Sequence, residues 1–457
     1  MNSAFGVKTA AGGPRAALAT LGCKVNQCES EAMTEALETR GFRMVPFSAE
    51  ADCYIVNTCT VTGRTDYQSR QMIRRAIRAN PRALIVVTGC YAQTNAADLA
   101  RIEGVTMIVG NREKGSLPQL IEDWWIQNKS ERSGPQGRQN RVSAFGEDDA
   151  FEMADLERFT GHTRAFLKVQ DGCNARCSYC IVPYARGRSR SLHPDTIIER
   201  ISRLADRSYR EVVLTGIHLG AFGQDLTPAT DLTALLERIE AQRSIERLRI
   251  SSIEPREVTD DFLELFKKAM VICPHLHIPL QSGDDTVLSL MNRNYTGSFF
   301  RALVEKVVAI RPEAAVGLDV MVGFPGEDEA AFQRTCRLIE ELPVAYLHVF
   351  PYSKRPGTPA ADMAGQVPDD RKKTRAACLR ELGLNKRRLF MERFICKPLQ
   401  VLIEGRIDKK TGFYKGFSQN YLPVMVVNGR APMINKIVTV VADKWDGSAM
   451  IGEVVHD

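Results

Sequence analysis

The chain has 457 residues, of which 44% are hydrophobic and 25% charged, and its formal net charge is +6. This length exceeds the size at which single hydrophobic cores stop growing, so two or three domains are expected, each able to fold without oligomerisation. No apolar run is long enough to span a membrane and the start of the chain, Met1 to Arg15, lacks a secretory signal, so we expect a cytoplasmic monomer. Twelve cysteines in a reducing compartment indicate metal ligands rather than a disulfide framework.

Short apolar runs alternate with helical patterns from Arg15 to about Lys129, which is typical of a doubly wound parallel sheet. The predicted strands are Ala16 to Gly22, Tyr54 to Thr58, Ala83 to Gly89 and Val105 to Gly110.

One cysteine directly follows each of the first three predicted strands, namely Cys23, Cys59 and Cys90. In an open α/β sheet ligands bind outside the carboxyl ends of the strands, so these thiols can meet despite their separation in sequence. We therefore predict that they hold an iron–sulfur cluster, the alternative being three small apolar residues in turns. Cys28 falls inside the following helix and Cys53 lies at the opposite end of its strand, so both are predicted packing residues.

The sequence turns polar and loses its hydrophobic period after Gln127 and before about Arg158, which predicts a linker. Beyond it, the apolar alternation from Arg164 to Gln170 predicts a strand.

A short loop after that strand holds Cys173, Cys177 and Cys180 at the spacing Cys-x3-Cys-x2-Cys. Thiolate is the soft ligand of zinc, copper(I) and iron–sulfur clusters. A structural zinc site requires four ligands, whereas three cysteines leave one iron of a cubane cluster open to a small molecule. The spacing favours the cluster, with zinc completed by a distant Cys or His as the alternative.

Six strand-like runs, each before a helical pattern or a break, predict a barrel or part of one between Arg164 and Ser353. They are Arg164 to Gln170, Glu211 to Leu219, Arg247 to Ile253, His275 to Leu280, Ala315 to Val322 and Ala345 to Phe350. Polar and Gly residues gather at their carboxyl ends, where barrel active sites lie, and for each of them a turn or helix cap is the alternative. The candidates are Thr215, Gly216, His218, Glu254, Gln281, Gly323 and Tyr352.

A long helical pattern from about Asp369 to Phe394 is strongly basic and includes Lys386, Arg387 and Arg388. A second basic helix, from Arg64 to Arg78, includes Arg74 and Arg75. After Cys396, alternating strands predict a small antiparallel β-barrel. Either helix alone could be a solvated face, but the two together with a β-barrel favour a polyanion, and RNA in particular.

The order of these parts resembles the radical S-adenosylmethionine (SAM) methylthiotransferases from about Ala17 to Val455. Residues 21 to 27, 172 to 180 and 184 to 191 most resemble the branch acting on N6-threonylcarbamoyladenosine beside the tRNA anticodon. The implied organisation is an α/β domain at 14–126, a linker at 127–158, a radical SAM core with a partial (βα)6 barrel at 159–394, and an RNA-binding β domain resembling the TRAM module at 395–457.

The resemblance implies two 4Fe–4S clusters, one at Cys173, Cys177 and Cys180 that binds SAM, and an auxiliary one at Cys23, Cys59 and Cys90. The barrel candidates would contact SAM and the basic helices would bind tRNA. The implied reaction adds a methylthio group to carbon 2 of the modified adenosine at position 37, using an adenosyl radical, with an electron donor and a sulfur donor as further partners. Alternatives are isopentenyladenosine in tRNA or an aspartate of a ribosomal protein as substrate, or a non-catalytic iron–sulfur RNA-binding redox sensor.

Overall fold

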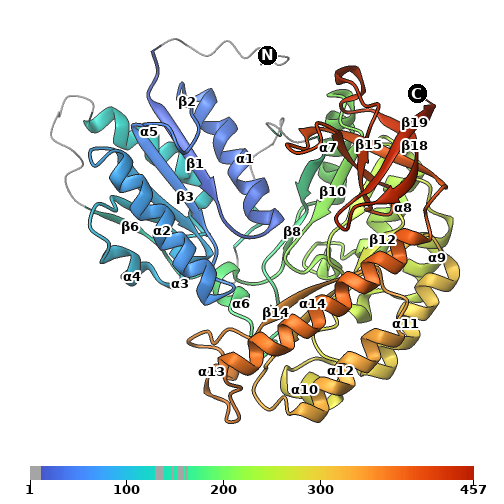
Figure 1. Ribbon diagram of the computed structural model, residues 1–457. Helices are drawn as coiled ribbons and strands as arrows, with labels where there is room; N and C mark the ends of the chain where they lie inside the picture. The colour runs from blue at the N-terminus through green and yellow to red at the C-terminus, as the bar shows by residue number, and fades with distance from the viewer. Residues whose placement is uncertain (1–11, 129–137, 147–148, 153–158, 160–162, 457) are drawn as a thin grey trace. The chain divides into compact units, whose positions relative to one another are not determined.

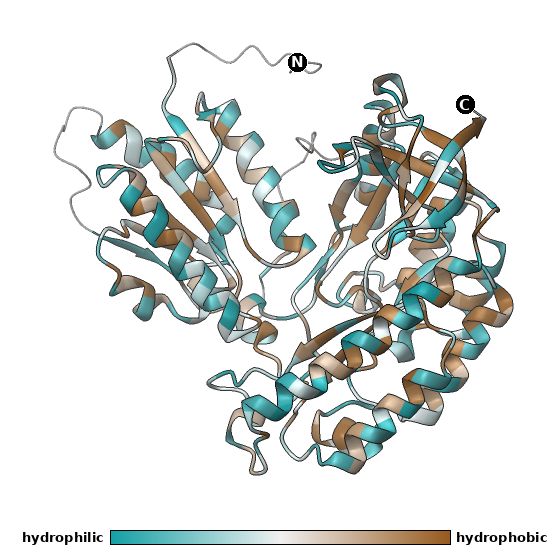
Figure 2. Cartoon of the chain, in the orientation of Figure 1, coloured by the Kyte–Doolittle hydropathy of each residue, from teal (hydrophilic) through white to brown (hydrophobic). Residues whose placement is uncertain are grey.

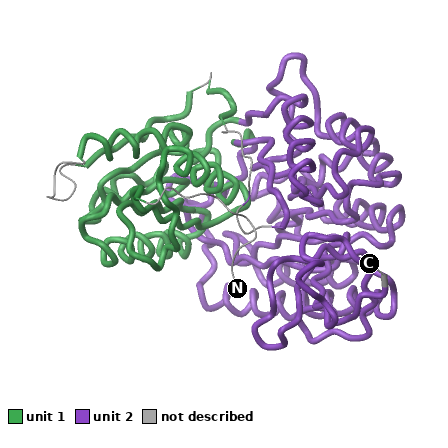
Figure 3. The backbone as a smooth tube through the Cα atoms, turned by 90° about the horizontal axis from the view of Figure 1, so that it is seen from above, with its two compact units in different colours: residues 1–158, 172–174, 181–188 green, residues 159–171, 175–180, 189–457 purple. Residues whose placement is uncertain are grey.

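The computed structural model describes residues 12–128, 138–146, 149–152, 159 and 163–456, and these divide into two compact units (Figures 1 and 3). Unit 1 comprises residues 1–158, 172–174 and 181–188, and unit 2 comprises residues 159–171, 175–180 and 189–457. Most of the start of the chain, in which no signal was predicted, lies outside the described residues, as do parts of the predicted linker. No helix in the described part of the chain combines the length and the apolar character needed to cross a bilayer.

Unit 1 is built on a six-stranded sheet in the order β2-β1-β3-β4-β5-β6, in which all neighbouring strands are parallel. Its strands are β1 (Arg15–Thr20), β2 (Arg43–Met44), β3 (Cys53–Thr58), β4 (Leu84–Gly89), β5 (Met107–Val109) and β6 (Gln139–Arg141). Its helices are α1 (Lys24–Thr39), α2 (Gly63–Ala79), α3 (Cys90–Thr94), α4 (Ala96–Ala100), α5 (Leu117–Asn128) and α6 (Val182–Arg186). The predicted doubly wound fold is confirmed.

Alternate residues of the central strands build two apolar cores, one on each face of this sheet. Ile55 of β3 belongs to the core that includes residues of α1 and α5. Its neighbours Tyr54 and Val56 belong to the other core, which includes residues of α2, α3 and α4. Because strands covered on both faces read as continuous apolar runs, β1, β3 and β4 were recognisable in the sequence, and they are brown in Figure 2.

Three elements of unit 1 depart from the sequence predictions, and the first is the short strand β2, which was not predicted. The edge strand β6, which pairs with β5, lies inside the stretch that was predicted to be a linker. Its residues are polar and largely exposed, so they carry no apolar period. Helix α6 lies within the predicted radical SAM core at 159–394, yet residues 181–188 belong to unit 1.

Unit 2 contains six parallel strands in chain order, as predicted, arranged as two three-stranded sheets, β11-β10-β7 and β12-β13-β14. The strands are β7 (Ala165–Lys168), β10 (Glu211–Thr215), β11 (Arg247–Ile250), β12 (His275–His277), β13 (Ala315–Val322) and β14 (Tyr346–Pro351). Parallel bridges, Leu248 to Ile272 and Ser252 to His277, join the two sheets. The result is a partial (βα)6 barrel, hereafter the half-barrel.

Helices connect the strands of the half-barrel, and a short ribbon of β8 (Gln170–Asp171) and β9 (Arg190–Ser191) follows β7. The helices are α7 (Pro194–Asp206), α8 (Leu232–Gln242), α9 (Asp260–Lys268), α10 (Asp285–Leu290), α11 (Gly297–Ile310), α12 (Glu329–Glu341), α13 (Pro359–Asp362) and α14 (Asp369–Glu392). Several begin at the side-chain caps that the sequence offers. Asp231, Asp284 and Asp328 each accept a hydrogen bond from the backbone N–H three residues on.

The chain ends in a closed β-barrel with the strand order β15-β16-β17-β19-β18. Its strands are β15 (Pro398–Ile407), β16 (Tyr414–Ser418), β17 (Pro423–Val426), β18 (Ile437–Trp445) and β19 (Met450–His456). The predicted small barrel is confirmed. Strand β19 was not predicted, and its pairing with β17 is parallel, whereas the other pairs are antiparallel.

Two buried arginines on β11 connect this β-barrel to the half-barrel. Arg247 and Arg249 are 2% and 1% exposed. Nε of Arg249 pairs with Oε1 of Glu211 at 2.8 Å, and its Nη1 donates to the carbonyl of Gln419 at 2.9 Å. Nη2 of Arg247 donates to the carbonyl of Gln400 at 2.8 Å. Since a buried guanidinium is costly unless its donors are satisfied, these bonds fix the β-barrel against β11.

Candidate functional site

The cysteines Cys23, Cys59 and Cys90 stand at one edge of the sheet in unit 1, as predicted. Cys23 is the N-cap of α1, Cys59 directly follows β3, and Cys90 is the first residue of α3 directly after β4. Strands β1, β3 and β4 are adjacent and parallel, so their carboxyl ends lie side by side.

Several contacts link the chain segments that carry these three thiols. A Cβ on Gly22, which has φ of +101°, would lie 3.0 Å from Sγ of Cys59, so only glycine fits between the two chain segments. Sγ of Cys90 accepts a hydrogen bond from Nδ2 of Asn111 at 3.5 Å. Burial and then the charges of Cys90 and Cys23 raise the pKa of Cys59 to about 11. The three thiols therefore belong to one region of unit 1, and their role as a common ligand set stays a prediction.

A buried group of charges lies beside these thiols. Glu29 bonds Lys114 through Oε2 to Nζ at 2.6 Å and Arg186 through Oε1 to Nη1 at 2.8 Å. Burial lowers the pKa of Lys114, which Glu29 opposes, and burial raises the pKa of Cys23, which the charge of Arg186 opposes. Two cations thus face one carboxylate.

The surplus positive charge of this group is what an anionic cluster held by three thiolates requires. The residues of unit 1 therefore fit an iron–sulfur cluster. The packing alternative does not explain the buried cations.

Two other cysteines of unit 1, Cys28 and Cys53, are buried. Cys28 is fully buried on α1. Cys53 is fully buried as the first residue of β3, and burial raises its pKa well above the usual range. Buried thiols of this kind are usually inert, and the packing role of Cys28 and Cys53 stays a prediction.

The loop with the second set of cysteines follows β8 directly. Cys173, which falls in unit 1, donates its backbone N–H to the carbonyl of Gly187 at 3.1 Å. Cys177 and Cys180 fall in unit 2, where the N–H of Cys180 donates to the carbonyl of Cys177 at 3.0 Å. All three are partly exposed free thiols, and their role as cluster ligands stays a prediction.

An arginine that the sequence analysis missed connects this loop to the half-barrel. Nη1 of Arg293 lies 3.4 Å from Sγ of Cys177, and the same guanidinium forms a two-pronged ion pair with Glu254. Burial raises the pKa of Glu254, which Arg293 opposes. Arg293 carries no sequence signal because it follows α10 in an ordinary turn. Of the predicted barrel candidates, Glu254 is thereby placed next to a loop cysteine.

Three other candidates lie together just beyond β10. Thr215, the last residue of β10, is 2% exposed. A Cβ on Gly216 would lie 2.9 Å from Oε1 of Gln170, and that oxygen also accepts the backbone N–H of His218 at 2.7 Å. His218 pairs with Glu257, Nε2 to Oε1, at 2.5 Å. Gln170 therefore fixes the backbone at this strand end.

The last three candidates follow the strands of the second three-stranded sheet, β12-β13-β14. Gln281 has φ of +60° and bridges to Val320 of β13. The backbone N–H of Gly323, which follows β13, donates to Oε1 of Glu327 at 2.8 Å. Tyr352 is 3% exposed and packs against Phe324 with ring centroids 5.5 Å apart.

The basic helices differ in how their cations are used. A hollow of about 450 Å³ on unit 1 is lined by Arg70, Arg74, Ile77, Arg78, Asp98, Arg101, Ile102 and Glu103. Arg70, Arg74 and Arg78 belong to α2, and Arg75 is exposed on that helix. On α14, Nζ of Lys386 donates to the carbonyl of Leu342 at 2.8 Å and Nη2 of Arg387 donates to that of Ser448 at 2.8 Å. Arg388 pairs with Glu392. Cations of both surfaces have partners, since in the hollow Arg70 donates to the hydroxyl of Tyr91 at 2.8 Å and Arg101 pairs with Asp98.

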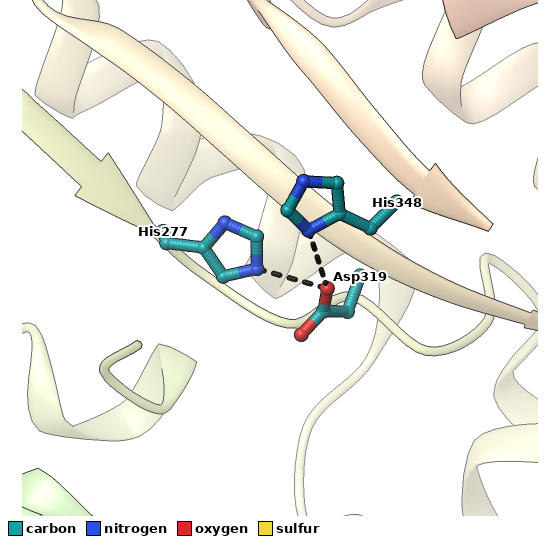
Figure 4. A group of neighbouring side chains, drawn as sticks. All are labelled: His277, Asp319 and His348. Atoms are coloured by element: carbon teal, nitrogen blue, oxygen red, sulfur yellow. Dashed lines mark ion pairs between the residues drawn. The ribbon is translucent and has the colours of Figure 1, made fainter. Parts of the chain in front are cut away.

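A polar group on the inner face of the half-barrel was also missed. His277 of β12, Asp319 of β13 and His348 of β14 converge (Figure 4). One ring nitrogen of each histidine and one carboxylate oxygen of Asp319, the atoms that could bind a metal ion, all lie within 4.8 Å of one another. Asp319 interrupts an apolar strand, and this was the one available signal.

Comparison with known proteins agrees with this geometry. The family described as uncharacterized protein family UPF0004 matches residues 15–110, and the radical SAM superfamily matches residues 167–339. The radical SAM methyltransferase TsrM from Kitasatospora setae, solved with cobalamin and a 4Fe–4S cluster, aligns with a TM-score of 0.57 at 16% identity over 76% of this chain and 77% of that one. The fold and the loop cysteines define a radical SAM enzyme.

Relatives that align over most of their own length show which family of radical SAM enzymes the chain belongs to. The threonylcarbamoyladenosine tRNA methylthiotransferases MtaB from Bacillus subtilis and Aquifex aeolicus are 41% and 38% identical, covering 92% and 88% of this chain and 92% and 97% of their own. A tRNA-2-methylthio-N(6)-dimethylallyladenosine synthase from Syntrophobacter fumaroxidans is 35% identical, covering 92% of this chain and 91% of its own. The chain belongs to the radical SAM methylthiotransferase family, in the MtaB branch. The predicted enzyme class is confirmed, and with it S-adenosylmethionine and 4Fe–4S clusters as cofactors.

Proposed function

We propose that this enzyme adds a methylthio group to carbon 2 of N6-threonylcarbamoyladenosine at position 37 of tRNA. Several full-length relatives of 35–41% identity carry the name of this activity. The observation that carries the proposal is the presence of two cysteine sets, one of them beside a buried surplus of positive charge in unit 1. An RNA-binding redox sensor would need neither two sets nor the polar strand ends of a half-barrel.

Two residue sets would hold the clusters, Cys23, Cys59 and Cys90 for the auxiliary one and Cys173, Cys177 and Cys180 for the one that binds SAM. When bound, the clusters and SAM supply radical formation, sulfur and methyl transfer. The chain's own part is to place the base. Arg293 supports the loop at Cys177, and Gln170 shapes the end of β10. Glu254 and the other strand-end candidates are proposed to contact SAM.

The proposed RNA surface comprises the hollow along α2, with Arg74 and Arg75, and the β-barrel with Arg388 of α14. Four arginines against two acids make the hollow cationic, which suits phosphate. An exposed aromatic on the same helix, Tyr67, offers a stacking surface. Lys386 and Arg387 contribute to this surface indirectly, because their hydrogen bonds to backbone carbonyls hold α14 in place. The protein works as a cytoplasmic monomer together with an electron donor and a sulfur donor.

The test is mass analysis of tRNA nucleosides from a strain that lacks this protein. Loss of 2-methylthio-N6-threonylcarbamoyladenosine, restored by the wild-type chain but not by a Cys177→Ala chain, supports the proposal. Loss of the methylthio derivative of isopentenyladenosine would assign the other tRNA substrate. Unchanged tRNA with an altered ribosomal protein would assign the protein substrate.

A further inference from the structure

The inner face of β14 carries a histidine that is both exposed and held in place. Successive residues of a strand point to opposite faces. A Cβ on Gly383 of α14 would lie 3.2 Å from Cβ of Leu347, so Leu347 points to the helix. Tyr346, His348 and Phe350 therefore point to the inner face, where β12 and β13 contribute His277 and Asp319.

A chain of hydrogen bonds orients this histidine. Nδ1 of His348 lies 3.3 Å from Oδ1 of Asp319, and Nε2 of His277 lies 2.9 Å from the same oxygen (Figure 4). Nδ1 of His277 lies 3.1 Å from the hydroxyl of Tyr346. Burial raises the pKa of Asp319, but the hydrogen bonds of the two histidines outweigh it, so the pKa is held below its usual range. The carboxylate stays ionised and fixes Nδ1 of His348 as a donor.

Exposure increases along this chain from the inside outward. The side chains of His277, Asp319 and His348 are 9%, 23% and 55% exposed. Only His348 has a nitrogen, Nε2, that faces open space while its other nitrogen is anchored. Phe350, which is 45% exposed, lies beside it with ring centroids 6.4 Å apart. An anchored imidazole next to an exposed aromatic ring suits a ligand with an anionic group on a flat or apolar body.

The arginines nearest this face are already paired with carboxylates. On the inner face and its junction with the β-barrel, Arg164, Arg247 and Arg249 stand against Glu211 and Glu404. A ligand carboxylate would accept a hydrogen bond from Nε2 of His348, while Nδ1 of the same ring lies 3.3 Å from Oδ1 of Asp319. An apolar ligand would instead bury His348 and Asp319 without a partner for Nε2, which is unfavourable.

We propose that His348, oriented by Asp319 and His277, binds the carboxylate of the amino-acid group on the substrate adenosine. This inference rests on the proposed function, since a threonylcarbamoyl group ends in a carboxylate and an isopentenyl group does not. The inner face of β14 is then the site that distinguishes the two tRNA substrates. His348 acts here as a specificity-determining residue, while Asp319 and His277 are positioning residues.

The experiment measures binding of anticodon stem-loop RNA to the reconstituted enzyme. Four RNAs are compared, carrying threonylcarbamoyladenosine, its methyl ester, isopentenyladenosine or plain adenosine at position 37. Wild type should bind the free acid about 10- to 100-fold more tightly than the ester, the value of a hydrogen bond to a charged group. His348→Phe should lose that preference, and His348→Gln should keep part of it because an amide still donates. His193→Gln is the matched control, since His193 is 56% exposed and lies at the start of α7.

Four results would overturn either the role of His348 or the proposed function itself. Retention of the full preference by His348→Phe, with iron content unchanged, would overturn the inference while leaving the proposed function intact. Equal binding of acid and ester by wild type would also overturn it. So would stoichiometric Co²⁺ binding that His348→Phe abolishes, because the three side chains would then be a metal site. If wild type preferred the isopentenyl RNA and modified it, the proposed function itself would fail.

Discussion

Arg186 and Glu29 form a buried ion pair, with 2.8 Å between Nη1 and Oε1, although they are far apart in the sequence. Lys114 bonds the other carboxylate oxygen, Oε2, at 2.6 Å. One carboxylate therefore holds two cations in the interior of unit 1, beside the thiols of Cys23 and Cys90. This arrangement explains why Arg186, which follows the loop of Cys173, Cys177 and Cys180 in the sequence, belongs to unit 1.

Replacing Glu29 by glutamine should lower the free energy of unfolding of the chain by about 3–5 kcal/mol, because both cations would stay buried without their anion. Urea unfolding of the variant and of wild type measures the difference. Glu38→Gln, on the exposed part of the same helix, is the control and should change stability by less than about 0.5 kcal/mol. Equal midpoints for Glu29→Gln and Glu38→Gln would show that the ion pairs contribute nothing.

Anaerobic reconstitution should give about eight irons per chain, the content of two four-iron clusters. Replacing Cys173, Cys177 and Cys180 together by alanine should leave half of the iron, and replacing Cys23, Cys59 and Cys90 together should also leave half. Iron analysis with Mössbauer spectra of each variant measures this. Wild-type iron content in either triple variant would show that its thiols are not ligands.

The buried thiols Cys28 and Cys53 should not affect iron binding. Cys28→Ala and Cys53→Ala remove only packing atoms, so iron content should match wild type while thermal stability falls slightly. The two measurements are made on the same reconstituted samples. A variant that lost half of its iron would place that cysteine among the ligands in place of a predicted one.

The hollow along α2 should bind phosphate without reading sequence. Arg74→Gln combined with Arg75→Gln should weaken binding of cognate and non-cognate tRNA alike and reduce the salt dependence by about one unit of log–log slope per lost contact. Arg82→Gln, an exposed arginine outside α2, is the control. Lys386→Met should act differently, lowering stability, since its Nζ bonds backbone carbonyls. An unchanged salt slope in the α2 variant would remove this surface from the RNA site.

The sequence was most informative where one signal repeats locally. Cys23, Cys59 and Cys90 were singled out because each follows a predicted strand, and Cys173, Cys177 and Cys180 because of their close spacing in one loop. Strand β13 was predicted with its observed bounds because its apolar run is unbroken except at Asp319. Strand β6 was not predicted because an edge strand can be wholly polar, as Gln139–Arg141 is. Arg293, Lys114 and Arg186 escaped for another reason. Their importance lies in partners that are remote in the chain, and a lone charged residue in a sequence does not reveal that it is buried.

The activity itself is tested most directly by incubating the reconstituted enzyme with SAM, a reductant and a stem-loop RNA that carries threonylcarbamoyladenosine, followed by mass spectrometry of the RNA. The account predicts that this RNA gains the mass of one CH2S unit on the modified adenosine, and that the RNA with isopentenyladenosine does not. A Cys59→Ala chain should cleave SAM yet leave the RNA unmodified. Modification of the isopentenyl RNA alone, or SAM cleavage that never leads to a change in RNA mass, would contradict the account.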